Sequence, residues 1–167
     1  MAERQDPRPW RACVGLMLFG PDGRVWVGDR LDTPGDHWQM PQGGIDEGES
    51  PREAALRELH EEIGTDKAEI LAEHPEWLKY DLPPEISAKI WDGRYRGQKQ
   101  RWFALRFTGR DEDIRLDSHV REFESWKWED IDRLPDLVVG FKRDIYEQVV
   151  AAFRHLAKDQ GLPPHEP

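Results

Sequence analysis

The sequence predicts an α/β protein with a mixed sheet held between helices, and two observations lead to this fold class. Segments of strand-like composition outnumber helical segments, and the two long helical segments occur singly, far apart in the chain. Because a sheet and a helix each have to bury one apolar side, such a mixture packs in layers. The chain has 167 residues, and we expect residues 1–167 to form a single domain.

The first elements are predicted to be a β-hairpin and a short extended segment. Residues 12–19 are an apolar strand, residues 20–23 (Gly-Pro-Asp-Gly) are a turn sequence, and residues 24–28 return as a second strand. Residues 37–40 are a further extended segment. A helix then follows at residues 50–63.

The second half of the chain alternates between strands and longer polar segments. We predict strands at residues 70–76, 101–108 and 124–129, a long polar and aromatic insertion at residues 77–100, and an amphipathic helix at residues 141–156. Trp126 and Trp128 are expected on one face of their strand. The polar, proline-containing ends at residues 1–9 and 158–167 are expected to be frayed.

The helix at residues 50–63 carries clear start and stop signals. Ser50 is a suitable N-cap, Pro51 suits the first helical position, and Glu53 completes a capping box. Gly64 is placed to end the helix in the left-handed conformation. The apolar stripe is predicted to consist of Ala55, Leu56, Leu59 and Ile63.

The other side of this helix carries three glutamates, Glu58, Glu61 and Glu62, at spacings of three and four residues. Like charges at such spacings destabilise a helix by roughly 0.2–0.5 kcal/mol per pair, and the helix dipole disfavours anions near this end. A solvated acidic face is one interpretation. A divalent cation with oxygen ligands is the other, and it turns the repulsion into a binding site. Arg57 can reach toward Glu61 and hold it.

The spacing around the glutamates decides between these interpretations. Gly43, five residues, Glu49, seven residues and then Arg57-Glu58-Leu59-His60-Glu61-Glu62-Ile63-Gly64 resembles the Nudix box at every fixed position. The resemblance implies an α/β/α sandwich with a loop–helix–loop motif, and hydrolysis of a phosphoanhydride bond assisted by Mg²⁺, for which Mn²⁺ or another divalent ion can substitute. It also implies catalytic or metal-binding roles for Arg57, Glu58, Glu61, Glu62 and the backbone near Gln42, with Glu58 as one candidate for the general base.

Other segments resemble one branch of this family, the bacterial RNA pyrophosphohydrolases and the related asymmetrical dinucleoside tetraphosphate hydrolases. The matching segments are residues 38–44, 77–83, 97–103 and 140–144. This resemblance implies a further metal-proximal residue, Glu122. It also implies a set of contacts to phosphates and to a stacked base: Arg11, Arg30, Lys79, Tyr80, Lys99 and Phe141.

Composition restricts the partners. A net charge of −10 disfavours an extended basic face for duplex DNA, although a compact phosphate cluster needs only a few local cations and a metal. The chain has no apolar stretch of membrane-spanning length and no apolar signal core at its N-terminus. Its single cysteine, Cys13, fits a reducing compartment, so we expect a cytoplasmic protein that does not bind a membrane. The sequence leaves the oligomeric state open.

Four functions remain open at this stage. Removal of pyrophosphate from triphosphate RNA ends is favoured slightly, and asymmetrical cleavage of dinucleoside tetraphosphates is the main alternative. A non-catalytic nucleotide-sensing domain would be expected to lack box glutamates, and none is missing here. Cleavage of a nucleotide sugar fits poorly with the segments at residues 77–80 and 97–100, an argument from analogy alone.

Overall fold

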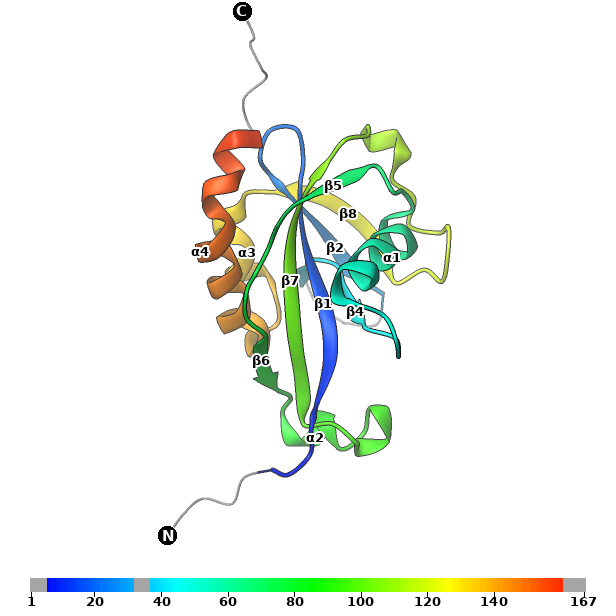
Figure 1. Cartoon of the computed structure of the whole chain (residues 1–167), viewed down its shortest axis with the longest axis vertical. Coiled ribbons are helices and arrows are strands. Elements are labelled where there is room, and N and C mark those ends of the chain that lie inside the picture. Colours follow the sequence, from blue (N-terminus) through cyan, green and yellow to red (C-terminus); the bar gives the residue numbers. More distant parts are fainter. Residues whose placement is uncertain (1–5, 32–36, 161–167) are drawn as a thin grey trace, which may run out of the picture.

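The computed structural model describes residues 6–31 and 37–160, whose eight strands form one mixed sheet (Figure 1). The main strand order is β3-β2-β1-β7-β5, while β4 pairs with β1, β6 with β7 and β8 with β2. The strands are β1 (Trp10–Phe19), β2 (Val25–Arg30), β3 (Trp38–Gln39), β4 (Gln42–Gly44), β5 (Ala68–Glu73), β6 (Leu78–Asp81), β7 (Gly97–Phe107) and β8 (Phe123–Glu129). The helices are α1 (Pro51–Ile63), α2 (Pro84–Ser87), α3 (Leu134–Leu137) and α4 (Arg143–Gln160).

The centre of the sheet is the long parallel pair β1 and β7, in register from Trp10 opposite Gly97 to Phe19 opposite Arg106. The other strand pairs are antiparallel among the described residues. Gly15 is required in β1, because a Cβ there would lie 2.4 Å from the Trp102 ring. The two strands therefore form a rigid, closely packed platform from which other elements project.

Two apolar clusters cover the two faces of this platform, as the sequence predicted. On one face, Leu59 and Ile63 of α1 pack with Leu16 of β1 and Phe103 of β7. On the other face, Val149 and Phe153 of α4 pack with Met17 of β1 and Trp102 of β7. Figure 1 shows α1 and α4 on opposite sides of the sheet. The predicted α/β class, with a mixed sheet between helices, is confirmed.

The ends of α1 follow the predicted local signals. The Ser50 side chain accepts from the Glu53 amide, the Glu53 carboxylate accepts from the Ser50 amide, and Gly64 has a φ of 82°. The predicted apolar stripe is wrong at Leu56, which is 42% exposed. Instead, α1 buries Ala54 and, unexpectedly for charged side chains, Glu58 and Glu62.

Three segment predictions need correction. The proposed insertion at residues 77–100 contains β6 and the start of β7, and successive side chains of these strands face opposite sides of the sheet. Residues 6–9 are not frayed, since Arg8 donates to the Gly93 carbonyl and the Pro9 carbonyl accepts from the Arg96 amide. The last helix begins at Arg143 and runs through Gln160. The remaining end residues, 1–5 and 161–167, lie outside the described residues.

Candidate active site

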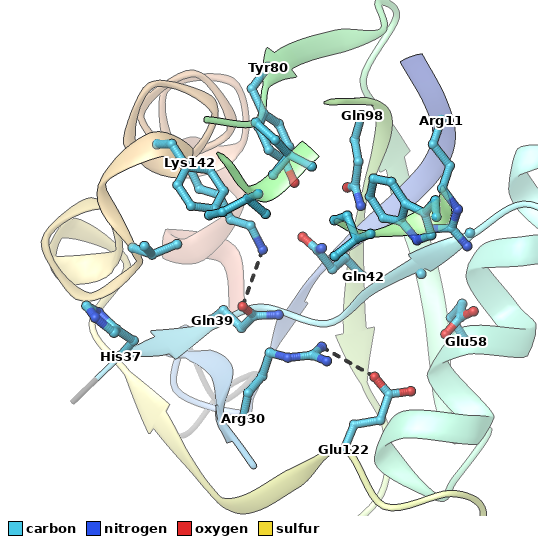
Figure 2. Close-up of a pocket in the computed structure, with 18 of the residues that line it drawn as sticks. Arg11, Arg30, His37, Gln39, Gln42, Glu58, Tyr80, Gln98, Glu122 and Lys142 are labelled. Carbon is cyan, nitrogen blue, oxygen red and sulfur yellow. Dashed lines mark hydrogen bonds and ion pairs between the residues drawn. The ribbon is translucent and has the colours of Figure 1, made fainter. Parts of the chain in front are cut away.

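A cavity of about 690 Å³ opens beside β4 and the acidic side of α1 (Figure 2). Its walls come from β1, β2, β3, β4, β6, β7 and α1, from residues 82–91, from residue 122 before β8, and from the turn that precedes α4. The cavity brings together most of the side chains that the sequence singled out: Arg11, Arg30, Gln42, Glu58, Glu61, Tyr80, Glu122 and Phe141. Segments as far apart as β1 and the α4 turn thus contribute to one site.

Two neighbouring carboxylates are buried on α1, of which Glu58 lines the cavity and Glu62 does not. Glu58 is 7% exposed and Glu62 is 3% exposed. Gly43 lets Glu58 approach β4, because a Cβ at that glycine would lie 2.0 Å from the Glu58 Cδ. Burial raises the pKa of Glu58, and burial together with the neighbouring Glu58 raises the pKa of Glu62 well above its ordinary range.

The buried pair predicts how stability depends on pH in the absence of metal. A carboxyl whose pKa is raised in the folded protein contributes stability that is complete below the unfolded pKa of about 4.3 and is lost as the pH rises through the folded value. We expect the Tm of the metal-free protein to fall more steeply above this pH in the wild type than in Glu62→Gln. Thermal unfolding in the presence of a chelator measures the difference, and parallel curves would contradict it.

Arg57 fixes the acidic loop against the helix. Its Nε and Nη2 donate to the two carboxylate oxygens of Glu49 at 2.8 and 3.0 Å, and Nη2 also donates to the Gly44 carbonyl at 2.8 Å. Its Nη1 donates to Glu58 at 2.9 Å, and lies at 3.4 Å from both oxygens of Glu61. The predicted contact with Glu61 is present, but the forked contact with Glu49 is shorter and organises the loop.

The opposite wall carries a second pair of charges. Arg30 Nη1 donates to Glu122 Oε1 at 3.3 Å, and Figure 2 shows this pair among the residues that line the cavity. His119 Nε2 lies 3.8 Å from Glu61 Oε1. The Glu122 charge also contributes to the raised pKa of Glu62, which places the negative charges of both walls within electrostatic reach of one another.

The acidic side chains fit a divalent cation only after some rearrangement. Across residues 6–31 and 37–160, no three acidic, histidine or cysteine side chains converge closely enough to hold an ion as they stand. However, neither Glu62 carboxylate oxygen has a hydrogen-bond donor among these residues. Glu58 can satisfy Glu62 only if the two share a proton. Buried charges are normally paired or bound to metal, so the residues fit a divalent cation after a change in carboxylate positions.

The far end of the cavity is aromatic. The Tyr80 and Phe141 rings have centroids 5.8 Å apart and are tilted by 30°. Phe141 lies in the 3-10 turn Gly140–Lys142, before α4, so it does not begin the apolar stripe of the helix, and it lines the cavity. Burial raises the pKa of Tyr80, so its hydroxyl stays protonated at neutral pH and can donate to a phosphate oxygen.

Arg11 is held from several sides at the cavity wall. Its guanidinium lies 5.0 Å from the centroid of the Trp91 ring, and Nη1 lies 3.5 Å from Cys13 Sγ. Gly44 leaves room for it, because a Cβ there would lie 2.3 Å from Arg11 Nη2. Trp91 has a φ of 51°, which is unusual for a residue with a bulky side chain. A cation prepositioned in this way loses little freedom when it binds an anion.

The structure does not bring Lys79 and Lys99 into the cavity. They pair with each other across β6 and β7, whereas the neighbouring pair, Tyr80 and Gln98, lines the cavity from the opposite face. The resemblance assigned substrate contacts to Lys79 and Lys99 because they lie in matched segments. Successive side chains of a strand point to opposite faces, so a residue next to a cavity residue points away from the cavity. Their proposed contact with the substrate phosphates at the reaction centre is therefore not supported by their position.

The family model of the NUDIX domain matches residues 9–149 of the chain. The chain belongs to the NUDIX domain family. An RNA pyrophosphohydrolase from Cereibacter sphaeroides is 50% identical over 152 residues, covering 89% of this chain and 94% of that protein. An RNA pyrophosphohydrolase from Brucella anthropi is 50% identical over 159 residues, covering 89% of this chain and 91% of its own. The Nudix resemblance seen in the sequence is confirmed.

Two solved structures share the fold. The E. coli dihydroneopterin triphosphate pyrophosphohydrolase superposes with a TM-score of 0.67 at 23% identity, covering 87% of this chain and 99% of its own. A C. elegans Ap4A hydrolase, in a binary complex, has a TM-score of 0.60 at 18% identity, covering 86% of this chain and 98% of its own. At these identities the likeness establishes the shared architecture only.

Sequence reasoning missed several residues of this NUDIX cavity. Gln39, Gln98, Trp91 and Lys142 all line it. Lys142 is 9% exposed and its Nζ lies 3.4 Å from Gln39 Oε1, as Figure 2 shows. Its position next to Phe141 in a matched segment was an available signal. Gln39 and Gln98 also lie in matched segments, but strand pairing decides which way their side chains point.

That chain of hydrogen bonds orients the polar floor of the cavity. Trp102 Nε1 donates to Gln100 Oε1 at 2.9 Å, and Gln100 Nε2 donates to Gln98 at 2.7 Å and to Gln42 at 3.2 Å. Each amide is thereby turned so that its oxygen accepts from the neighbouring side chain. The buried Trp102 ring anchors the chain, so the amides of Gln98 and Gln42 are preorganised for a ligand.

Proposed function

We propose that this protein is a Mg²⁺-dependent RNA 5′ pyrophosphohydrolase that removes pyrophosphate from triphosphate RNA ends. The observation that carries the proposal is the buried Glu62 carboxylate, which has no donor among the described residues and neighbours Glu58, a residue of the cavity lining. A stable fold tolerates such a group when a cation completes it. The names of the relatives from Cereibacter sphaeroides and Brucella anthropi support RNA as the substrate.

The proposed metal ligands are the carboxylates of Glu58, Glu61, Glu62 and Glu122 with the backbone near Gln42. Bound Mg²⁺ would supply a Lewis acid for the phosphate oxygens and would lower the pKa of the attacking water. Glu58 lines the cavity beside the other proposed ligands, which makes it the candidate general base for that water. Arg57 holds Glu58 in place through its 2.9 Å contact.

The remaining cavity residues are proposed to bind the substrate. Arg11 and Arg30 are candidates for the phosphate chain, since guanidinium groups bind phosphate oxygens in a forked geometry. Tyr80 would donate its hydroxyl to a phosphate oxygen, while Phe141 would stack on the first base. Base and phosphates would then occupy the aromatic and the acidic ends of the same cavity, with the scissile bond near Glu58 and Glu61.

No helix within residues 6–31 and 37–160 combines the length and the hydropathy needed to cross a membrane. We propose a cytoplasmic location, which agrees with a substrate that is produced by transcription. Cys13, the only cysteine of the chain, is fully buried as a free thiol, as suits a reducing compartment.

The deciding experiment compares kcat/KM, with Mg²⁺ present, on triphosphate-ended RNA and on diadenosine tetraphosphate. We expect a clear preference for RNA and release of pyrophosphate from it. A preference for the dinucleotide would instead assign the cavity to dinucleoside tetraphosphate cleavage, because both substrates offer a base and a phosphate chain. Activity on neither substrate would overturn the enzymatic proposal in favour of nucleotide sensing.

The role of Phe141 gives a separate prediction for binding. Phe141→Ala should raise KM for triphosphate RNA by about tenfold, because stacking on one base contributes about 1–3 kcal/mol. Phe141→Tyr keeps a ring at the site and should retain nearly the wild-type KM. Steady-state kinetics and Tm are measured together, and a lower Tm with an unchanged KM in Phe141→Ala would show that the ring serves only packing.

A further inference from the structure

The two lysines that point away from the cavity are part of a larger group of basic and aromatic side chains. Lys79 and Lys99 face each other across β6 and β7. Figure 1 shows the lower halves of β1 and β7, together with β6, extending past α1. We call the group on this part of the sheet and its margins the basic strip, and it consists of Trp10, Trp77, Lys79, Arg96, Lys99 and Arg101.

Each tryptophan of the basic strip holds two cations. Lys79 Nζ and Arg96 Cζ lie 4.4 and 4.3 Å from the centroid of the Trp10 ring. Lys99 Nζ and Arg101 Cζ lie 5.1 and 4.8 Å from the centroid of the Trp77 ring. Such contacts hold long side chains in an extended position at about 0.5–1 kcal/mol each at exposed sites. The basic strip is therefore an ordered row of positive charges.

The charges of the basic strip are only partly neutralised. Arg96 pairs with Asp81 at 2.9 Å, and Arg101 Nη1 lies 3.6 Å from Glu73. Asp81 also accepts from Trp10 Nε1 at 3.0 Å, so it fixes the ring as well. Neither lysine has a carboxylate partner among residues 6–31 and 37–160. The chain as a whole has a net charge of −10, so these two adjacent lysines form a local region of positive charge on an acidic protein.

We propose that the basic strip binds single-stranded RNA downstream of the 5′ end that occupies the cavity. This inference rests on the proposed function, since it assigns a second contact to the same substrate. Ordered cations interleaved with aromatic rings are the chemistry that binds a single strand without sequence preference. Tyr80 faces the cavity and its neighbour Lys79 faces the strip, so the two sites are separated only by the thickness of β6. An RNA that leaves the cavity over this strand meets Lys79 and Lys99.

The test removes the two lysine charges and varies the length of the substrate. Lys79→Gln/Lys99→Gln should lower kcat/KM on a long, unstructured triphosphate RNA by about tenfold at low salt, while kcat/KM on a triphosphate dinucleotide stays unchanged. The slope of log kcat/KM against log salt on the long RNA should become shallower by about 1.4, at roughly 0.7 per phosphate contact for a single strand. Equal losses on both substrates, or no loss on the long RNA, would overturn the proposal.

A matched control removes the same charge elsewhere. Arg133→Gln/Arg154→Gln replaces two exposed arginines whose surface ion pairs join them to Glu129 and Asp132, and it should leave the length dependence unchanged. Tm measurements on both double variants check the fold. Anisotropy with a labelled 5′-hydroxyl RNA separates this inference from the proposed function. Weaker binding in the lysine variant supports the basic strip even if the wild type hydrolyses neither substrate, whereas unchanged binding contradicts it.

Discussion

Replacing Glu62 with glutamine is expected to lower kcat by about a thousandfold or more, while the protein folds as before. Several kcal/mol of transition-state stabilisation are assigned to the metal, and each 1.36 kcal/mol corresponds to about a tenfold change in rate. Glutamine keeps the shape of the side chain but removes the charge that the 3%-exposed Glu62 would offer to a cation. Single-turnover kinetics on triphosphate RNA with saturating Mg²⁺ measure the chemical step.

The same substitution should have the opposite effect on stability. The wild type buries two neighbouring carboxyl groups, and both have a raised pKa because their charged forms are disfavoured there. Near neutral pH and without metal, Glu62→Gln should therefore have a higher Tm than the wild type. Added Mg²⁺ should raise the Tm of the wild type more than that of the variant. Near-normal turnover, or an equal response to Mg²⁺, would remove Glu62 from the proposed metal site.

The second large effect is expected from Arg57→Lys, which should reduce kcat by about 10–100-fold, the usual cost of losing a group that orients metal ligands. Lysine keeps the positive charge. It cannot, however, reproduce the forked contact with Glu49, the bond to the Gly44 carbonyl and the bond to Glu58 at the same time. The loop between Gly44 and Glu49 would then no longer be held in place against α1.

Arg52→Lys provides the matched control for this prediction, because Arg52 is exposed in the first part of the same helix. It should retain wild-type kinetics. If the role of Arg57 is to orient the carboxylates, the apparent affinity for Mg²⁺ should weaken in Arg57→Lys and stay unchanged in Arg52→Lys. A fall in kcat with unchanged dependence on Mg²⁺ would instead place Arg57 in direct contact with the reacting phosphate.

Local signals determined α1 and its chemistry. The capping box, the left-handed Gly64 and the spacing of Arg57 and the glutamates depend on residues within about four turns of one another, so the pattern in the chain is also the pattern in space. For the same reason the continuous apolar run of β1 located the central strand. The error at Leu56 arose because Glu58 and Glu62, which hydropathy assigns to solvent, occupy part of the buried side.

By itself, the sequence determined the family, the layered fold, and the proposal that a carboxylate-rich helix meets a phosphate-rich substrate. Only the tertiary structure decided which side chains line the cavity. Tyr80 and Gln98 line the cavity while their neighbours Lys79 and Lys99 lie on the other face. This choice depends on how β6 pairs with β7, and a shift of one residue in that register would reverse every side chain of β6. Such pairing joins distant segments, and no local pattern records it.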